Sequence, residues 1–233
     1  MDLFFGIASD DNSITLDETE SNHLINVKRA KTGDLIQVTD GKGNLFSAEL
    51  LNIQQRQCKL LVRTSEKTIS TKFKLHIALA PTKNIDRMEW FLEKATETGI
   101  DEISFIICRH SERREIKTER LQRVLISSMK QSLKTFLPKM NQPKNFNNFI
   151  KEKNDSTKLL FSMDANKDQN LKKHYRAGSS LTALIGPEGD FHPEELKLAI
   201  ENNFMLTSLG DQRLRTETAA LSVCTLFNFI NSQ

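Results

Sequence analysis

The chain of 233 residues is 38% hydrophobic and 27% charged, which is enough for one large domain or two smaller ones around a folded core. No apolar run approaches the roughly 20 residues that cross a bilayer, and no signal-peptide pattern opens the chain, so we expect a cytoplasmic protein. Three isolated cysteines without a CxxC pair argue against zinc. The net charge is only +3, but residues 109–144 hold ten basic and three acidic residues, typical of a phosphate-binding surface or of a solvated helix face.

Short strands joined by tight turns are predicted over residues 1–70. The expected strands are residues 3–5, 13–16, 35–39, 45–53 and 57–62, with one short helix over residues 17–27. Such a pattern is typical of a small β-barrel. Residues 63–72 are polar and have no core pattern, so we expect a linker there.

From Phe73 onward the pattern alternates between strands and helices. The expected strands are residues 73–80, 102–108, 159–163, 181–185 and 204–209. The expected helices are residues 86–98, 118–136, a helix that begins at Pro193, and residues 218–230. This alternation predicts an α/β domain whose largely parallel sheet is covered by helices.

Two glycine-containing loops follow consecutive strands near the C-terminus. The first reads GPEG (residues 186–189), and the second runs from Gly210 to Thr218. Ligands of open α/β sheets bind at the carboxyl ends of strands, so these loops could form two walls of one pocket. Neither loop matches a P-loop or a GxGxxG fingerprint.

The start of the last helix carries an unusual charge pattern. A helix N-terminus explains Thr216 as a cap and Glu217 as a favourable charge. It does not explain Arg213 and Arg215, which lie where positive charge is unfavourable. We interpret these arginines as partners of a carboxylate or a phosphate.

Other polar side chains have a structural explanation beside the functional one. Lys83 and Arg87 follow a predicted strand and could point into the same crevice or be surface charges. Gln131 and Ser132 lie beside the apolar face of the long helix, where a buried polar pair would need partners. Ordinary helix packing explains that pair about as well.

Glu93, Lys94 and Glu97 on the helix of residues 86–98 could form local ion pairs only. The five histidines show no metal-ligand spacing, so no metal site is predicted.

Several motifs together resemble one family. GPEGDF, LGDQRLRTETA, APTKNIDR, EKATETG and MKQSLKTFLP are similar to motifs of the RsmE-type 16S ribosomal RNA (uracil-N3) methyltransferases of the SPOUT superfamily. HLINVKRAKTGDLIQVTDGKGNLF resembles their N-terminal PUA-like, RNA-binding domain. The chain departs from the family pattern at Asp190, at Gln212-Arg213 and at Lys134, where we expect glycine, Arg-Ile and arginine.

The resemblance implies a PUA-like domain over residues 1–70 and a SPOUT methyltransferase domain with a deep trefoil knot over residues 73–233. It further implies a homodimer that binds S-adenosyl-L-methionine in the knot and acts on a uridine of 16S ribosomal RNA or the small ribosomal subunit. The expected cofactor-binding residues are Met163, Ile185, Gly186, Gly189, Leu209, Gly210, Leu214, Thr216 and Thr218.

Methylation of uracil N3 needs a base for the N3 proton and a cation for the uracil anion that forms. Glu188 or Glu217 could be the base, and Arg215 could stabilise the anion. The residues expected to contact RNA are Lys28, Arg29, Lys83, Arg87, Gln131, Ser132 and Lys134. The alternatives are a non-catalytic ribosomal RNA-binding module with a vestigial pocket, which Asp190 favours, and a small-molecule α/β enzyme, which the basic clusters disfavour.

Overall fold

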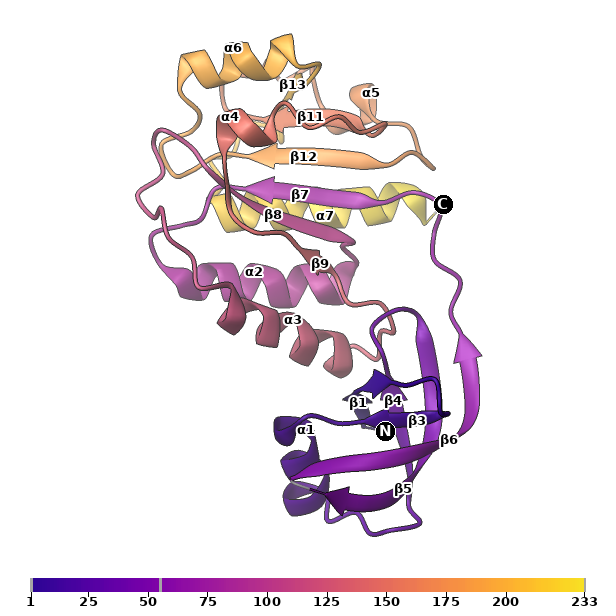
Figure 1. The fold of residues 1–233 in the computed structure, drawn as a ribbon. Helices are drawn as coiled ribbons and strands as arrows, with labels where there is room; N and C mark the ends of the chain where they lie inside the picture. Colours follow the sequence, from indigo (N-terminus) through magenta and orange to yellow (C-terminus); the bar gives the residue numbers. More distant parts are fainter. Residues whose placement is uncertain (1, 55, 233) are drawn as a thin grey trace. The chain divides into compact units, whose positions relative to one another are not determined.

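The computed structural model describes residues 2–54 and 56–232. The chain forms two compact units, and the first combines residues up to Ser70 with Ile126–Leu137 (Figure 1). The second unit contains Thr71–Leu125 and the residues from Pro138 onward. The segment of residues 126–137, which the sequence places in the second domain, therefore groups with the N-terminal residues.

The N-terminal unit is a curled six-stranded sheet with the strand order β1-β4-β5-β6-β3-β2. Its elements are β1 (Leu3–Phe5), β2 (Ile7–Ala8), β3 (Ser13–Thr15), α1 (Glu18–Asn22), the π-helix η1 (His23–Val27), β4 (Leu35–Thr39), β5 (Asn44–Gln54) and β6 (Gln57–Lys67). Phe4, Leu16, Leu24, Val38 and Leu60 are buried together in its core. The strands predicted from the sequence are confirmed, and β2 was not predicted.

Strand β6 is longer than the sequence indicated. It continues to Lys67, so the first half of the predicted linker at residues 63–72 is wrong. Ser65 pairs with Phe46 and Lys67 pairs with Asn44 on the neighbouring strand β5. Main-chain pairing does not require apolar side chains, which explains how a polar stretch remains in the sheet.

The long helix α3 (Thr118–Gln131) ends before Phe136, the end expected from its apolar spacing. Leu133 adopts a left-handed backbone with φ of 53°, which stops the helix. The Lys134 amide donates to the Met129 carbonyl oxygen at 2.9 Å and closes the last turn. The expected helix end is therefore wrong, because the turn forms well before Pro138.

The second unit contains a parallel sheet with the order β10-β8-β7-β12-β11-β13, and β9 pairs with β8. Its strands are β7 (Leu75–Leu79), β8 (Glu102–Ile107), β9 (Lys139–Met140), β10 (Lys144–Asn145), β11 (Thr157–Phe161), β12 (Leu181–Ile185) and β13 (Met205–Thr207). The pairings recorded between these strands are parallel, as predicted. The short strands β9 and β10 were not predicted.

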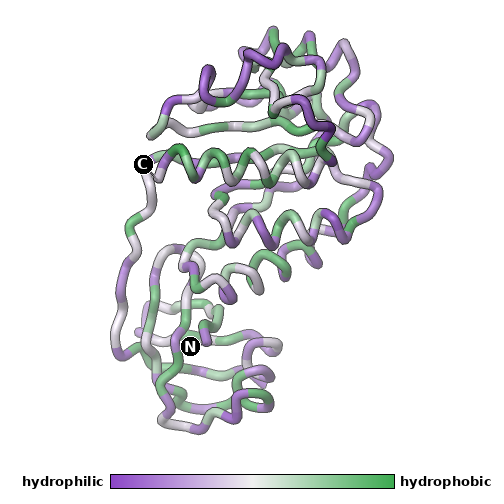
Figure 2. The backbone as a smooth tube through the Cα atoms, turned by 180° about the vertical axis from the view of Figure 1, so that it is seen from behind, coloured by the Kyte–Doolittle hydropathy of each residue, from purple (hydrophilic) through white to green (hydrophobic). Residues whose placement is uncertain are grey.

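Helices cover both faces of this sheet. Helix α7 (Thr216–Asn231) lies behind the sheet in Figure 1 and before it in Figure 2, where much of it is green. It packs on α2 (Ile85–Thr98), and Asn228 Nδ2 donates to the Gly99 carbonyl oxygen at 2.7 Å. The other face carries α4 (Phe146–Phe149) and α6 (Pro193–Glu201), whose apolar residues join one buried cluster with β7, β11 and β12.

The short helix α5 (Leu171–His174) contacts β13.

Within residues 2–54 and 56–232, no helix is both long and apolar enough to cross a membrane. Strand β12 is buried along its whole length, as its apolar sequence predicted.

Candidate functional site

A cavity of about 500 Å³ opens at the carboxyl ends of β11, β12 and β13. Three loops line it: residues 162–164 after β11, residues 186–190 after β12, and residues 208–214 after β13. Gly186 and Gly210 both lie on this cavity, so the prediction that the two loops form walls of one pocket is confirmed. The position agrees with the rule that ligands bind at strand carboxyl ends.

Thr216 connects the first turn of α7 to the loop after β12. Its hydroxyl donates to the Gly186 carbonyl oxygen at 3.0 Å, and only 5% of the residue is exposed. Its expected role as helix cap is wrong, because Arg215 occupies the cap position and makes no side-chain capping bond. The hydroxyl instead holds two walls of the cavity together.

Asp190 connects the loop after β12 to the loop after β11. Its Oδ2 accepts from the Ser162 hydroxyl at 2.8 Å and from the Met163 amide at 3.0 Å. Its Oδ1 accepts from the Phe191 amide at 2.8 Å. The residue has a left-handed backbone with φ of 59°, a conformation that aspartate tolerates better than most residues.

The loop that follows β8 braces the turn of residues 186–190. Buried Glu195 accepts from the Arg109 amide at 2.9 Å and from the His192 amide at 3.0 Å. A hydrogen bond of 3.0 Å joins His110 Nδ1 to the Asp190 carbonyl oxygen. This support could not be predicted from the sequence, because residues 108–111 lie far from the turn along the chain.

Cys108 lies at the start of the same bracing loop and is buried. Burial, with a further contribution from Glu195, raises the pKa of its thiol well above the ordinary value. Because a thiol in that state is protonated near neutral pH, Cys108 is not a candidate nucleophile.

Most of the predicted cofactor-binding residues come together. The lining of the cavity includes Met163, Ile185, Gly186, Gly189, Leu209, Gly210, Leu214 and Thr216. Thr218 lies further along α7 and is outside that lining. The apolar side chains of Phe161, Phe191 and Pro193 also line the cavity and were not predicted.

The three predicted catalytic residues lie in three different environments. Glu188 lines the cavity, and its Oε1 accepts from the Lys83 amide at 3.3 Å. Glu217 is buried, with Oε1 3.7 Å from Arg87 Nε and with an Oε2 that has no hydrogen-bond partner among the described residues. Arg215 is exposed at the start of α7, outside the cavity lining.

The residues expected to contact RNA are divided between the two units. Lys83 and Arg87 belong to the second unit, where Lys83 pairs with Glu112 at 3.0 Å. Lys28 pairs with Asp2 at 2.8 Å in the N-terminal unit, which also contains Arg29, Gln131, Ser132 and Lys134.

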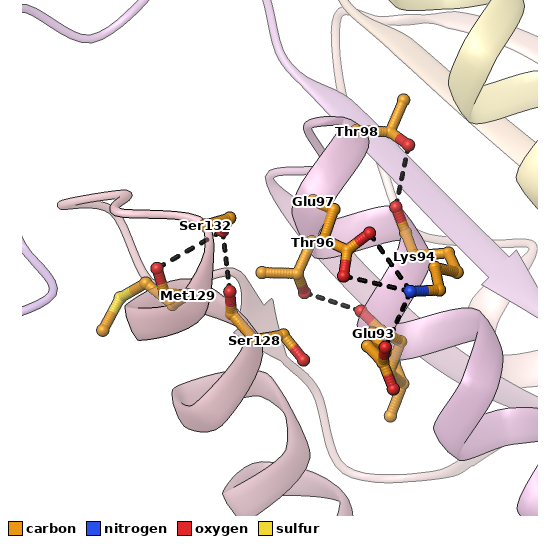
Figure 3. Close-up of polar contacts among 9 residues, drawn as sticks. Glu93, Lys94, Thr96, Glu97, Thr98, Ser128, Met129 and Ser132 are labelled. Atoms are coloured by element: carbon orange, nitrogen blue, oxygen red, sulfur yellow. Dashed lines mark hydrogen bonds and ion pairs between the residues drawn. The ribbon is translucent and has the colours of Figure 1, made fainter. Parts of the chain in front are cut away.

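The polar pair of the long helix is not buried as expected, because Gln131 is exposed and Ser132 is half-buried. The Ser132 hydroxyl donates to the Ser128 carbonyl oxygen at 2.7 Å (Figure 3). In the second unit, Lys94 donates to Glu93 at 2.7 Å and to Glu97 at 3.1 Å (Figure 3). These contacts support the local, structural interpretation of both motifs.

The charges around the cavity are mainly acidic. Asp164, Glu188 and Asp190 face a single lining arginine, Arg213, among the residues that form its wall. Such a wall favours a ligand with positive charge. In the described part of the chain, no group of three or more His, Cys, Asp or Glu residues is placed to hold a metal ion.

Comparison with known protein families gives two matches along the chain. A family model described as an RNA methyltransferase domain matches residues 70–228. A second model, described as an RNA methyltransferase PUA domain, matches residues 16–62.

Similar proteins cover nearly the whole length. A curated relative from Rickettsia conorii, named ribosomal RNA small subunit methyltransferase E, is 27% identical over 92% of this chain and 90% of its own. A crystal structure of a probable rRNA-methyltransferase from Porphyromonas gingivalis has a TM-score of 0.91 at 37% identity, covering 100% of this chain and 99% of that one. A ribosomal RNA small subunit methyltransferase E from Neisseria gonorrhoeae, bound to S-adenosyl methionine, has a TM-score of 0.84 at 25% identity and covers 99% and 98%.

Proposed function

The chain belongs to the RNA methyltransferase family, and we propose that it transfers the methyl group of S-adenosyl-L-methionine to N3 of a uridine in 16S ribosomal RNA. The observation that carries this proposal is the cavity shared by the loops after β11, β12 and β13. The names of the relatives support small-subunit ribosomal RNA as the substrate, and the uracil-N3 position follows from the resemblance of the motifs.

The cavity has the properties that this cofactor requires. Its volume of about 500 Å³ is in the range of small-molecule sites. Ile185, Leu209 and Leu214 offer apolar surface for a flat base, and Asp164 offers charge complementary to a sulfonium. S-adenosyl-L-methionine, when bound, supplies an activated methyl group, so the protein must position the uracil and accept its proton.

Glu188 is the better candidate for the base, because it lines the cavity while Glu217 is buried beside Arg87. A carboxylate at this place would take the N3 proton as the new N–C bond forms. Glu217 would instead orient Arg87. Arg215, exposed beside the cavity loop, would stabilise the negative charge that develops on the uracil oxygens.

RNA would be held by basic groups of both units. Lys28, Arg29 and Lys134 belong to the N-terminal unit, and Lys83 and Arg87 to the second. Each would bind phosphate, with Gln131 and Ser132 as polar contacts. Uracil N3 lies on the pairing edge, so the target base must be unpaired or flipped out before it reacts.

We further propose a deep trefoil knot in the second unit, a homodimer, and a cytoplasmic location with the ribosomal RNA. The knot is supported by the path after β13. This strand lies at the sheet edge, yet the next helix, α7, packs against β7, β12 and α2. Thr216 meanwhile contacts the loop after β12. We also propose that residues 1–70 and residues 73–233 are the two functional domains.

The test is nucleoside mass analysis of ribosomal RNA from cells that lack the protein, followed by complementation. We expect one N3-methyluridine to disappear and to return with the unsubstituted chain. Glu188→Gln should lower the rate of methyl transfer by about 100-fold or more, a larger effect than it has on cofactor binding. Arg215→Ala should likewise affect turnover more than cofactor binding, and normal turnover would remove Arg215 from the mechanism.

The alternative is an RNA-binding module with a vestigial pocket, which Asp190 in place of the expected glycine favours. Calorimetry with S-adenosyl-L-methionine separates the two functions. A heat of binding with the unsubstituted chain supports the enzyme, and its absence supports the vestigial module.

A further inference from the structure

Asp190 lies at the point where two cavity walls meet. Its Oδ2 binds the Ser162 hydroxyl and the Met163 amide, both from the loop after β11. The Ser162 hydroxyl in turn accepts from the Asp164 amide at 3.1 Å. One carboxylate therefore holds all three residues of that loop, directly or through Ser162.

We infer that Asp190 is a positioning residue that fixes the wall of residues 162–164 in its cofactor-binding shape. The inference rests on the proposed function for the identity of the ligand. Hydrogen bonds to a carboxylate are among the stronger ones in proteins, because one partner is charged. If the wall of residues 162–164 is already ordered before the ligand binds, binding does not include the entropy cost of ordering that wall.

The backbone of Asp190 supports this role. Its φ of 59° is unfavourable for most residues and costs a glycine nothing. We expect a side chain at such a position to make stabilising contacts that offset the unfavourable backbone. Oδ2 of Asp190 makes two such contacts, with Ser162 and with Met163. Asp190→Gly therefore removes the contacts without introducing backbone strain.

The first experiment measures the loop without any ligand. Amide hydrogen exchange at Met163 should be at least about tenfold faster in Asp190→Gly than in the unsubstituted chain, because its amide loses its acceptor. Asp168→Gly is the matched control, since Asp168 is an exposed aspartate outside the cavity lining. Unchanged exchange at Met163 in Asp190→Gly would overturn the inference, whatever the protein binds.

The second experiment measures dissociation constants for S-adenosylmethionine and for its product S-adenosylhomocysteine, whose thioether lacks the sulfonium charge. A positioning role predicts that Asp190→Gly weakens both by a similar factor of about ten, with a raised KM and a kcat changed less than about twofold. Ser162→Ala should weaken binding less, and adding it to Asp190→Gly should have little further effect.

Weakening confined to S-adenosylmethionine would overturn positioning, because it would mean that the charge of Asp190 acts on the sulfonium directly. Unchanged binding of both molecules would overturn it as well. If the unsubstituted chain binds neither molecule, the proposed function fails, while the exchange measurement still decides whether Asp190 fixes the loop.

Discussion

At the scale of single residues, Thr216 shows how one hydroxyl can join two segments of a site. Its donation to the Gly186 carbonyl oxygen satisfies a buried acceptor between α7 and the loop after β12. Replacement by valine keeps the shape and the β-branch but leaves that carbonyl without this partner. A buried group left unsatisfied costs about 1–3 kcal/mol.

We therefore expect Thr216→Val to lower the free energy of unfolding by about 1–3 kcal/mol and to weaken cofactor binding. Urea unfolding and calorimetry measure the two effects. Thr216→Ser is the matched control, because it retains the hydroxyl and should stay within about 1 kcal/mol of the unsubstituted chain. Equal stability of the valine and serine variants would show that the bond to Gly186 contributes nothing.

His76 makes stability depend on pH. Burial lowers the pKa of this imidazole below its ordinary value of 6.5. Glu102 and Glu152 raise this pKa by smaller amounts, and Lys139 and Lys144 lower it further. The unfolded chain thus takes up a proton near pH 6.5, while the folded chain takes it up only at lower pH. Folding is therefore favoured above pH 6.5, and the contribution is lost as pH falls from that value to the folded pKa.

The expected loss from His76 is at most about 1.4 kcal/mol per pH unit within that window. Unfolding in urea at about pH 7.5 and about pH 5.5 measures it, because histidine changes charge between these values. The matched variant is His76→Gln, which cannot titrate and should show a smaller decrease. An identical decrease in both proteins would assign the pH dependence to other groups.

At the scale of elements, the join between α2 and α7 depends on a glycine. Gly99 ends α2 with φ of 123°, and an added Cβ would lie 2.9 Å from Asn228 Oδ1. Asn228 donates from Nδ2 to the Gly99 carbonyl oxygen at 2.7 Å. A larger residue would therefore strain the backbone and displace the side chain that joins the helices.

We expect Gly99→Ala to lower the free energy of unfolding by about 2–4 kcal/mol, combining backbone strain with the disturbed contact. Gly178→Ala is a useful comparison, because Gly178 has φ of 81° but no atom of residues 2–54 and 56–232 lies within 4 Å of its added Cβ. It should cost only about 1–2 kcal/mol, from the left-handed backbone. Similar values for both variants would mean that the contact with Asn228 adds nothing.

The individual helices and strands show which parts of the fold could be predicted from the sequence. The units β12–α6 and β13–α7 were predictable because an apolar run, a glycine-containing turn and a helix follow one another locally. The end of α3 was not, because the apolar spacing continues to Phe136 while Leu133 turns the backbone. The extension of β6 to Lys67 was hidden because its partner strand β5 supplies the pairing.

The candidate site, like the fold, could be predicted from the sequence only in part. The glycines of its loops could be found from turn chemistry, whereas the bonds of Asp190 to Ser162 and Met163 depend on β11 and β12 being neighbours. The burial of Glu217 beside Arg87 likewise joins distant segments. Nothing in the local sequence indicates such contacts, because they depend on how strands and helices are placed in space.

At the scale of the whole molecule, the N-terminal unit is not continuous in sequence. The Gly43 amide donates to the Thr135 carbonyl oxygen, and the Leu137 amide donates to the Gly41 carbonyl oxygen, both at 2.9 Å. Lys130 forms an ion pair with Glu20 in which both side chains are largely buried. Residues 126–137 therefore complete the N-terminal unit, although the rest of α3 belongs to the other one.

A fragment of residues 1–70 should accordingly be less stable than the same fragment joined by a flexible linker to residues 126–137. The fragment alone leaves Glu20 without the ammonium of Lys130 and removes main-chain bonds from the loop of residues 41–43. Each kcal/mol lost lowers Tm by about 4–8 °C in a domain of this size, so thermal unfolding should separate the two by several degrees. A third fragment carries residues 126–137 in shuffled order and should melt with the fragment alone. If the native-order fragment melts no higher than the shuffled one, the segment does not stabilise the N-terminal unit, and the unit would be complete at Ser70.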